Sequence, residues 1–160
     1  MLRKQIIRAS ALTPVPTPGE IDIAAVATVL VTSEAPEHPV DFALDGHRGP
    51  GGSRWVAGEP GEQTLILAFD APQAIRRVAL EVEQTGVART QEVQLALSTD
   101  GGRTYGEVLR QEYNFSPPGT TFEREDWAVN AGGVTHLRLW IRPDKGDRPY
   151  RAMITSLVLS

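Results

Sequence analysis

The sequence contains no cysteine among its 160 residues. This absence excludes disulfide bonds, thiolate nucleophiles and cysteine-ligated metal sites. Long apolar runs are missing as well, because the most apolar stretch, residues 21–31, is too short to cross a bilayer. We therefore expect no membrane partner.

An excess of basic charge is also missing. The chain carries 20 acidic and 16 basic side chains and a formal net charge of -4, which gives no general field for attracting a phosphate backbone. We expect no nucleic-acid partner. The N-terminus begins with positive charge, but Arg8 interrupts it before an apolar core typical of a signal peptide forms, so we expect a cytoplasmic protein.

Sequence motifs of catalysis are lacking too. The three histidines, His38, His47 and His136, show no paired spacing typical of zinc sites. No Gly-x-Ser-x-Gly motif occurs, and Gly49 to Gly52 is not followed by the Lys-Ser/Thr of a phosphate-binding loop. Among the carboxylates, Glu81 and Glu83 are expected on the solvent side of a strand. These patterns predict a protein that is not an enzyme.

The composition is that of a folded protein, with 41% hydrophobic and 22% charged residues. Its length suits one domain with one core. We expect a basic and proline-rich arm at residues 1–20 and one domain at residues 21–160. The prolines of the arm favour an extended strap, and whether the arm is ordered stays open.

Short segments with apolar residues at every second position predict β-strands, each with one buried face. The clearest cover residues 78–83, 93–98 and 136–142, and further candidates are residues 26–33, 64–70, 104–113, 120–129 and 152–159. Residues 22–27 and 71–74 are each expected to form no more than one turn. No segment has the pattern of a stable helix, so we expect an all-β, antiparallel sandwich or jelly roll of about eight strands.

Residues 98–105, Ser-Thr-Asp-Gly-Gly-Arg-Thr-Tyr, fit the Asp-box pattern of sialidase propeller blades. A propeller needs several copies, and this chain has one. We therefore expect Asp100-Gly101-Gly102 to form a hairpin turn.

The order of several short motifs carries a family resemblance. They are Val31-Thr32-Ser33, Ala43-Leu44-Asp45-Gly46, Ser53-Arg54-Trp55, Leu65 to Asp70, Ser98-Thr99-Asp100-Gly101, Leu137-Arg138-Leu139 and Ile154 to Leu159. In this order they resemble the discoidin, or coagulation factor 5/8 type C, domain, a galactose-binding-like jelly roll, over residues 22–160. The resemblance implies a non-catalytic binding module that meets its ligand, often a carbohydrate, through loops at one end of the sandwich.

Many members of that family hold calcium beside an early loop, and the resemblance places Asp45 and Ser53 at two of its ligand positions. His47 stands where the family has a second acid, and Ser156 stands near the position of its glutamate. Because calcium prefers several carboxylate or carbonyl oxygens, we expect no cofactor and no calcium near Asp45.

Candidate ligand contacts lie in a glycine-rich loop, residues 47–54, which carries His47, Arg48 and Arg54. Guanidinium groups there could fork onto sugar hydroxyls, carboxylates or phosphates, although a solvated loop without a ligand is an equal alternative. Arg89, expected in a mid-chain loop, joins this set only if that loop folds toward the same end as His47.

Aromatic residues are a second signal, because the apolar face of a sugar packs on a flat ring. Tyr113 and Phe115 are expected in a loop and are the preferred aromatic contacts. Trp55 is expected in the core, whereas Trp140 and Trp127 are either packed or exposed. The leading hypothesis is a carbohydrate-binding module, and the alternative is a protein-interaction or assembly domain that uses a sheet face with Trp140 and the N-terminal arm. The oligomeric state stays open.

Overall fold

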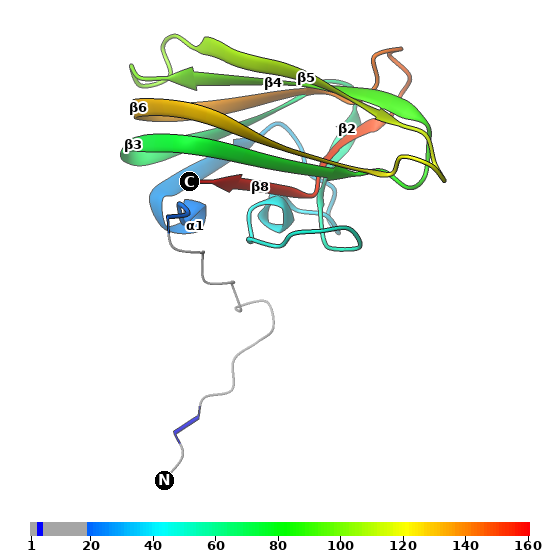
Figure 1. Ribbon diagram of the computed structural model, residues 1–160, viewed down its shortest axis with the longest axis horizontal. Helices are drawn as coiled ribbons and strands as arrows, with labels where there is room; N and C mark the ends of the chain where they lie inside the picture. The colour runs from blue at the N-terminus through cyan, green and yellow to red at the C-terminus, as the bar shows by residue number, and fades with distance from the viewer. Residues whose placement is uncertain (1–2, 5–18) are drawn as a thin grey trace.

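The computed structural model of the chain describes residues 3–4 and 19–160 (Figure 1). The predicted N-terminal arm therefore lies almost entirely outside the described residues. In chain order the elements are α1 (Ile23–Val26), β1 (Ala27–Val31), the 3-10 helix η2 (Val40–Ala43), β2 (Trp55–Pro60), β3 (Gln63–Glu83), β4 (Arg89–Ser98), β5 (Gly106–Phe115), β6 (Phe122–Arg142), β7 (Arg151–Ile154) and β8 (Ser156–Leu159).

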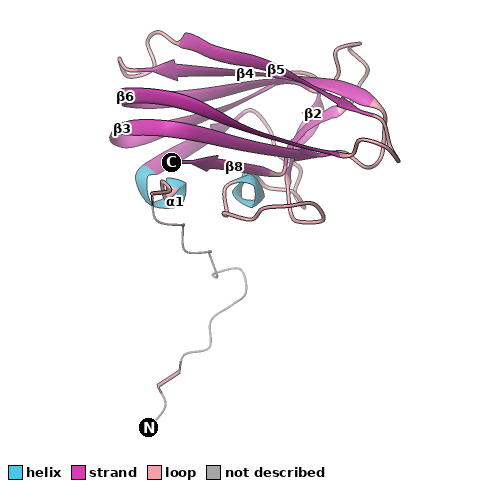
Figure 2. Ribbon diagram, in the orientation of Figure 1, coloured by secondary structure: helices cyan, strands magenta, loops and turns pink. Residues whose placement is uncertain are grey.

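All strand pairs are antiparallel. One sheet has the order β1-β3-β6-β4-β5, with β8 pairing β3, and a second sheet consists of β2 and β7. Figure 2 shows how strands dominate the structure, with two short helices beneath them. The predicted all-β, antiparallel sandwich of eight strands is confirmed.

Two long strands, β3 and β6, pair with each other along two stretches of the first sheet. Their first pairing joins Gln63–Ala68 to His136–Ile141, and their second joins Arg77–Glu83 to Phe122–Ala128. Register shifts separate the two pairings. Such bulges bend a strand without ending it, so the turn predicted at residues 71–74 is wrong and that segment continues β3.

The buried faces of the strands follow the predicted alternation. Leu65, Leu67, Val78, Leu80, Val82, Val93, Leu95, Leu137, Leu139 and Ile141 are all at most 1% exposed. Trp55 is fully buried, as expected, and its indole Nε1 donates a hydrogen bond of 3.0 Å to the carbonyl oxygen of Ser33. The core therefore lies between the sheet layers and is closed by β2.

The turn between β4 and β5 has the predicted hairpin chemistry. Gly101 and Gly102 adopt φ values of 80° and 83°, which glycine tolerates best. The carboxylate of Asp100 accepts hydrogen bonds from the backbone nitrogen of Thr104 at 3.0 Å and from its hydroxyl at 2.6 Å. These bonds lower the pKa of Asp100 to about 2. The single Asp box is thus satisfied within its own turn.

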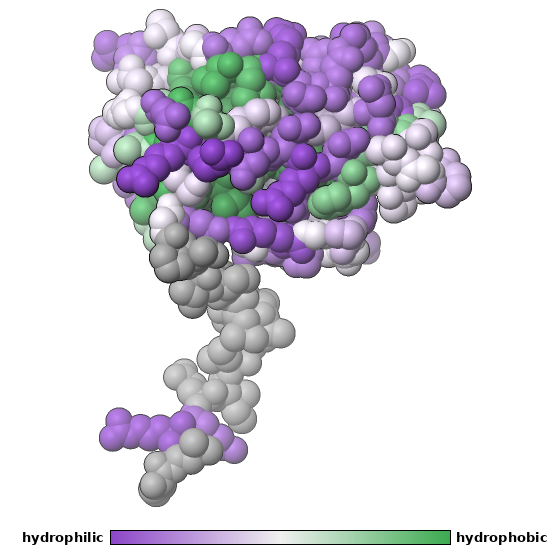
Figure 3. All heavy atoms as spheres, in the orientation of Figure 1, coloured by the Kyte–Doolittle hydropathy of each residue, from purple (hydrophilic) through white to green (hydrophobic). Residues whose placement is uncertain are grey.

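Among residues 3–4 and 19–160, neither helix approaches the length needed to span a bilayer. The face shown in Figure 3 is mostly hydrophilic, with apolar areas that are limited in extent.

Candidate functional site

The glycine-rich loop at residues 47–54 is held by two glutamates of β3. The backbone nitrogen of Gly49 donates to Glu81 at 2.9 Å, and that of Gly51 donates to Glu83 at 3.0 Å. Glu83 also pairs with Arg54 at 2.5 Å. The prediction that Glu81 and Glu83 face solvent is wrong: they are 4% and 6% exposed, because this loop folds over their side of the strand.

His47 is turned toward the protein, whereas the Arg48 side chain is 41% exposed. A Cβ atom placed on Gly52 would lie 1.5 Å from Nε2 of His47, so the imidazole ring lies directly against that glycine. This Nε2 atom is buried and has no hydrogen-bond partner among the described residues. Arg48 is paired with Glu20. Together with the Arg54 ion pair, these contacts hold the loop against the rest of the domain.

The loop does not have the donor set of a calcium site. One carboxylate oxygen of Asp45 accepts the backbone N–H of His47 at 2.9 Å, and the other accepts the Ser53 hydroxyl at 3.3 Å. The nearby Glu83 is engaged by Arg54 and a backbone N–H. In the part of the chain that the structure describes, no three histidine, aspartate or glutamate side chains are grouped to share a metal ion. The residues present therefore do not fit the calcium that the resemblance implies.

Tyr113 and Phe115 lie in β5 and not in a loop, so that prediction is wrong. Their side chains are 1% and 3% exposed, and their rings stack with centroids 6.5 Å apart. β5 extends two residues past its predicted end, and its alternate positions turn these rings toward the core. The Tyr113 hydroxyl is buried without a partner in the described residues, and burial raises its pKa. Neither ring is an exposed stacking platform.

Arg89 opens β4 and is only 4% exposed. Its Nη1 donates to the carbonyl oxygen of Arg151 at 2.7 Å, but Nε and Nη2 are buried and have no partner among the described residues. The guanidinium lies 5.9 Å from the centre of the Tyr150 ring. Burial lowers the pKa of Arg89 to about 10, and the charge of Asp144 opposes this shift.

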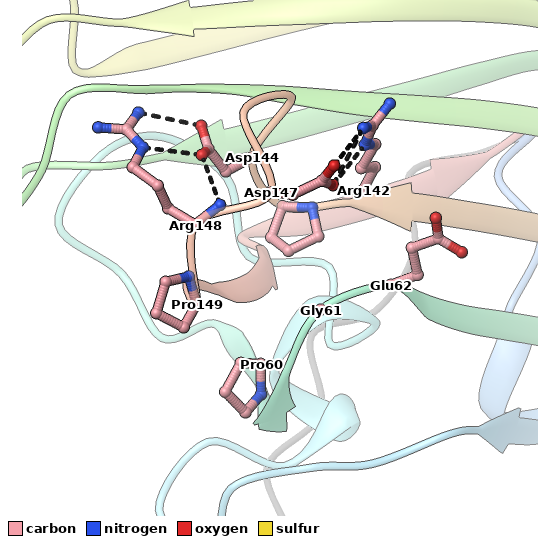
Figure 4. A pocket seen from close by; sticks show the side chains of 9 residues that line it. Pro60, Gly61, Glu62, Arg142, Asp144, Asp147, Arg148 and Pro149 are labelled. Carbon is pink, nitrogen blue, oxygen red and sulfur yellow. Dashed lines mark hydrogen bonds and ion pairs between the residues drawn. The ribbon is translucent and has the colours of Figure 1, made fainter.

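A hollow of about 300 Å³ lies at the end of the sandwich where β2 turns into β3 and β6 leads to β7 (Figure 4). The backbone nitrogen of Gly61 donates to the carbonyl oxygen of Tyr150 at 3.2 Å and thereby ties the two segments together. The lining combines three prolines with charged side chains: Pro60, Gly61, Glu62, Arg142, Pro143, Asp144, Asp147, Arg148 and Pro149.

Two ion pairs shape this first hollow. Arg142 binds the carboxylate of Asp147 at 2.9 Å and 3.0 Å, and Arg148 binds that of Asp144 at 2.8 Å and 3.1 Å (Figure 4). Arg148 lowers the pKa of Asp144 to about 2, mainly through its hydrogen bonds. Asp147 adopts a φ of 58°, a conformation that is uncommon for residues other than glycine and is often found at functional sites.

A second hollow, of about 350 Å³, adjoins the first, because Asp144 and Arg148 line both. Its other lining residues are Ala88, Arg89, Thr90, Phe115, Lys145 and Gly146. Two of the predicted contacts, Arg89 and Phe115, therefore meet at this loop end. Arg48 instead lines a smaller hollow, of about 130 Å³, with Arg77 and Arg124, so the structure does not bring the 47–54 loop and Arg89 into one of these hollows.

Sequence reasoning missed the segment that builds both hollows, residues 143–149. The sequence of this segment, Pro-Asp-Lys-Gly-Asp-Arg-Pro, could have indicated a functional loop, since prolines and charged residues between two strands are typical of such loops. The half-buried Trp140 also reaches this end, and its Nε1 donates to Glu62 at 3.4 Å. Trp127 is half-buried and packs against the core.

Comparison with known proteins identifies the fold. No protein-family model and no curated protein matches the sequence. Among solved structures, a CBM32 module of a family 31 glycoside hydrolase from Clostridium perfringens matches with a TM-score of 0.63 and 15% identity, covering 88% of this chain and 93% of that one. The family 32 module of NanJ from the same organism, solved with galactose, matches with a TM-score of 0.61 and 14% identity over 88% and 96% of the two chains.

A third match is the CBM32 of AlyQ, solved with 4,5-unsaturated mannuronic acid, with a TM-score of 0.59 and 16% identity over 84% and 95% of the two chains. At these identities the likeness establishes the fold. The chain has the discoidin, or galactose-binding-like, fold that its motif order predicted.

Proposed function

We propose that this chain is a non-catalytic carbohydrate-binding module and that its glycan lies in the hollow between the β2–β3 turn and residues 142–149. The fold supports this proposal, because the three solved structures compared above are carbohydrate-binding modules. The observation that carries it is the composition of the hollow, in which apolar proline rings and charged hydrogen-bonding groups face one space.

The lining matches the two sides of a pyranose. The rings of Pro60, Pro143 and Pro149 offer apolar surface to the C–H face of the sugar. Arg142 donates hydrogen bonds, and the carboxylates of Glu62 and Asp147 accept them from hydroxyls. The Asp147 side chain is 73% exposed, so its remaining lone pairs are open to a ligand.

Binding without hydrolysis is consistent with the state of Asp144. A glycosidase needs one carboxyl group that stays protonated near neutral pH and a second that is ionised. Arg148 lowers the pKa of Asp144 to about 2, so this carboxyl group is ionised near neutral pH and is not suited to act as the general acid. The arrangement suits recognition of hydroxyl groups.

A glycan array followed by calorimetric titration tests the proposal with two matched variants. Arg142→Ala removes an arginine that lines the hollow, and Arg77→Ala removes an arginine of β3 that is likewise paired with an aspartate, Asp126. We expect Arg142→Ala to weaken binding by about tenfold or more, since a hydrogen bond from a charged group is lost, and Arg77→Ala to leave it within about twofold. Absence of binding to every glycan, or equal losses in both variants, would contradict the proposal.

A further inference from the structure

Four charged side chains line the second hollow, and among them Arg89 is the one that forms no ion pair with a described residue. Two cations of this hollow have partners, because Arg148 pairs with Asp144 and Lys145 pairs with Glu112. Arg89 makes no ion pair with any described residue, and its Nε and Nη2 lack acceptors. Three cations, Arg89, Lys145 and Arg148, thus stand against two carboxylates, which leaves one positive charge.

An unmatched buried cation is unfavourable unless an anion or hydrogen bonds compensate it. Burial lowers the pKa of Arg89 to about 10, in the direction expected for a guanidinium whose charge lacks compensation. The rest of the lining leaves room for a negatively charged ligand that accepts hydrogen bonds. The Lys145 and Arg148 side chains are each 52% exposed, and Thr90 contributes to the wall.

We propose that this second hollow binds the anionic group of an acidic saccharide, such as the carboxylate of a uronic acid, while the neighbouring sugar occupies the first hollow. The inference rests on the proposed function and adds the class of glycan. Lys145 and Arg148 offer exposed N–H groups that touch the anion. Arg89, whose Nε and Nη2 are shielded from solvent, attracts it through the charge of its guanidinium.

The geometry of the two hollows suits a chain of linked sugars. Because the Asp144–Arg148 ion pair lines both, a saccharide can contact Arg142 on one side and Lys145 on the other. The Asp144 carboxylate is neutralised by Arg148 and only 2% exposed, so it opposes an incoming anion weakly. Selectivity for a charged sugar therefore depends on Arg89 and Lys145.

The test compares binding of trigalacturonate with binding of its fully methyl-esterified form, which has the same rings but no charge. We expect the acid to bind about tenfold or more tightly at low salt, and this preference to shrink as sodium chloride is added, because screening weakens attraction between charges. Arg89→Met should reduce the preference to about twofold or less, whereas Arg89→Lys should keep most of it, since lysine retains the positive charge.

A second variant keeps the test decisive if Arg89→Met, a substitution at a buried position, impairs folding. Lys145→Gln alters a side chain that is half exposed, and it should also reduce the preference for the acid. The matched control is Arg77→Gln, also half exposed and ion-paired, which should keep the full preference. Equal affinity for the acid and the ester, or a preference that survives both Arg89→Met and Lys145→Gln, overturns this inference.

The outcomes also separate this inference from the proposed function. A chain that binds neutral oligosaccharides through Arg142 but shows no preference for the acid is a carbohydrate-binding module whose second hollow takes no anion. A chain that binds no glycan of any kind overturns both.

Discussion

Replacing Glu83 with glutamine is expected to loosen the 47–54 loop and lower the stability of the whole domain. Glu83 is 6% exposed and accepts the backbone N–H of Gly51 at 3.0 Å and the Nη2 of Arg54 at 2.5 Å. Glutamine keeps the volume and one acceptor oxygen. It loses the negative charge and presents an NH₂ group that cannot accept the hydrogen bond from Arg54.

The magnitude follows from what remains after the substitution. A hydrogen bond to a charged group contributes about 1.5–3 kcal/mol, and removing one member of a buried ion pair costs about 3–5 kcal/mol. The Arg54 side chain keeps 19% exposure, so water partly compensates its charge. We therefore expect a loss of about 2–3 kcal/mol, which for a chain of this size lowers Tm by roughly 5–10 °C.

Urea unfolding followed by tryptophan fluorescence measures this loss, and amide hydrogen exchange at Gly51 reports the loop itself. The matched control is Asp126→Asn, which breaks the ion pair between Arg77 and Asp126, whose side chains are 50% and 43% exposed. Because exposed pairs contribute only about 0–1 kcal/mol, the control should change stability little. If Glu83→Gln costs no more than Asp126→Asn, and Gly51 exchanges at the unchanged rate, the bracing of the loop by β3 carboxylates is refuted.

Three further outcomes are expected. Tyr113→Phe should leave glycan binding unchanged and raise the free energy of unfolding by up to about 1 kcal/mol in chemical denaturation, because it removes a buried hydroxyl without a partner; a clear destabilisation would contradict this. Neither a millimolar excess of calcium chloride nor EDTA should shift Tm, because the Asp45 carboxylate is satisfied internally; a rise with calcium would show a site. The pKa of Asp144 is lowered to about 2, below its value in the unfolded chain, so its stabilisation of about 2 kcal/mol is complete above about pH 5 and is lost as the pH falls toward 2. The stability difference between the wild type and Asp144→Asn should therefore narrow between pH 5 and pH 2, and a constant difference would contradict the assignment.

Local patterns predicted much of the fold, because alternation along a strand is a property of neighbouring residues. The apolar series at Val78, Leu80 and Val82 identified a buried face, and Asp100-Gly101-Gly102 identified a hairpin. The predicted number of strands, eight, was right, although the predicted strands do not correspond one to one to the observed strands. Two pairs of predicted strands merge into β3 and β6, the last predicted strand divides into β7 and β8, and β2 was missed.

The sequence by itself therefore determined which residues alternate inward, where the tight turns lie, and the order of motifs that predicts a galactose-binding-like sandwich. Only the tertiary structure decided which polar groups are buried and which loops share an end. Glu81 looks like a solvent-facing residue in its strand and is buried because a loop 32 positions away folds over it. Arg89 and residues 143–149 likewise meet only because β4 pairs with the end of β6, where Glu92 lies opposite Arg142, and such contacts between distant segments leave no mark on any local pattern.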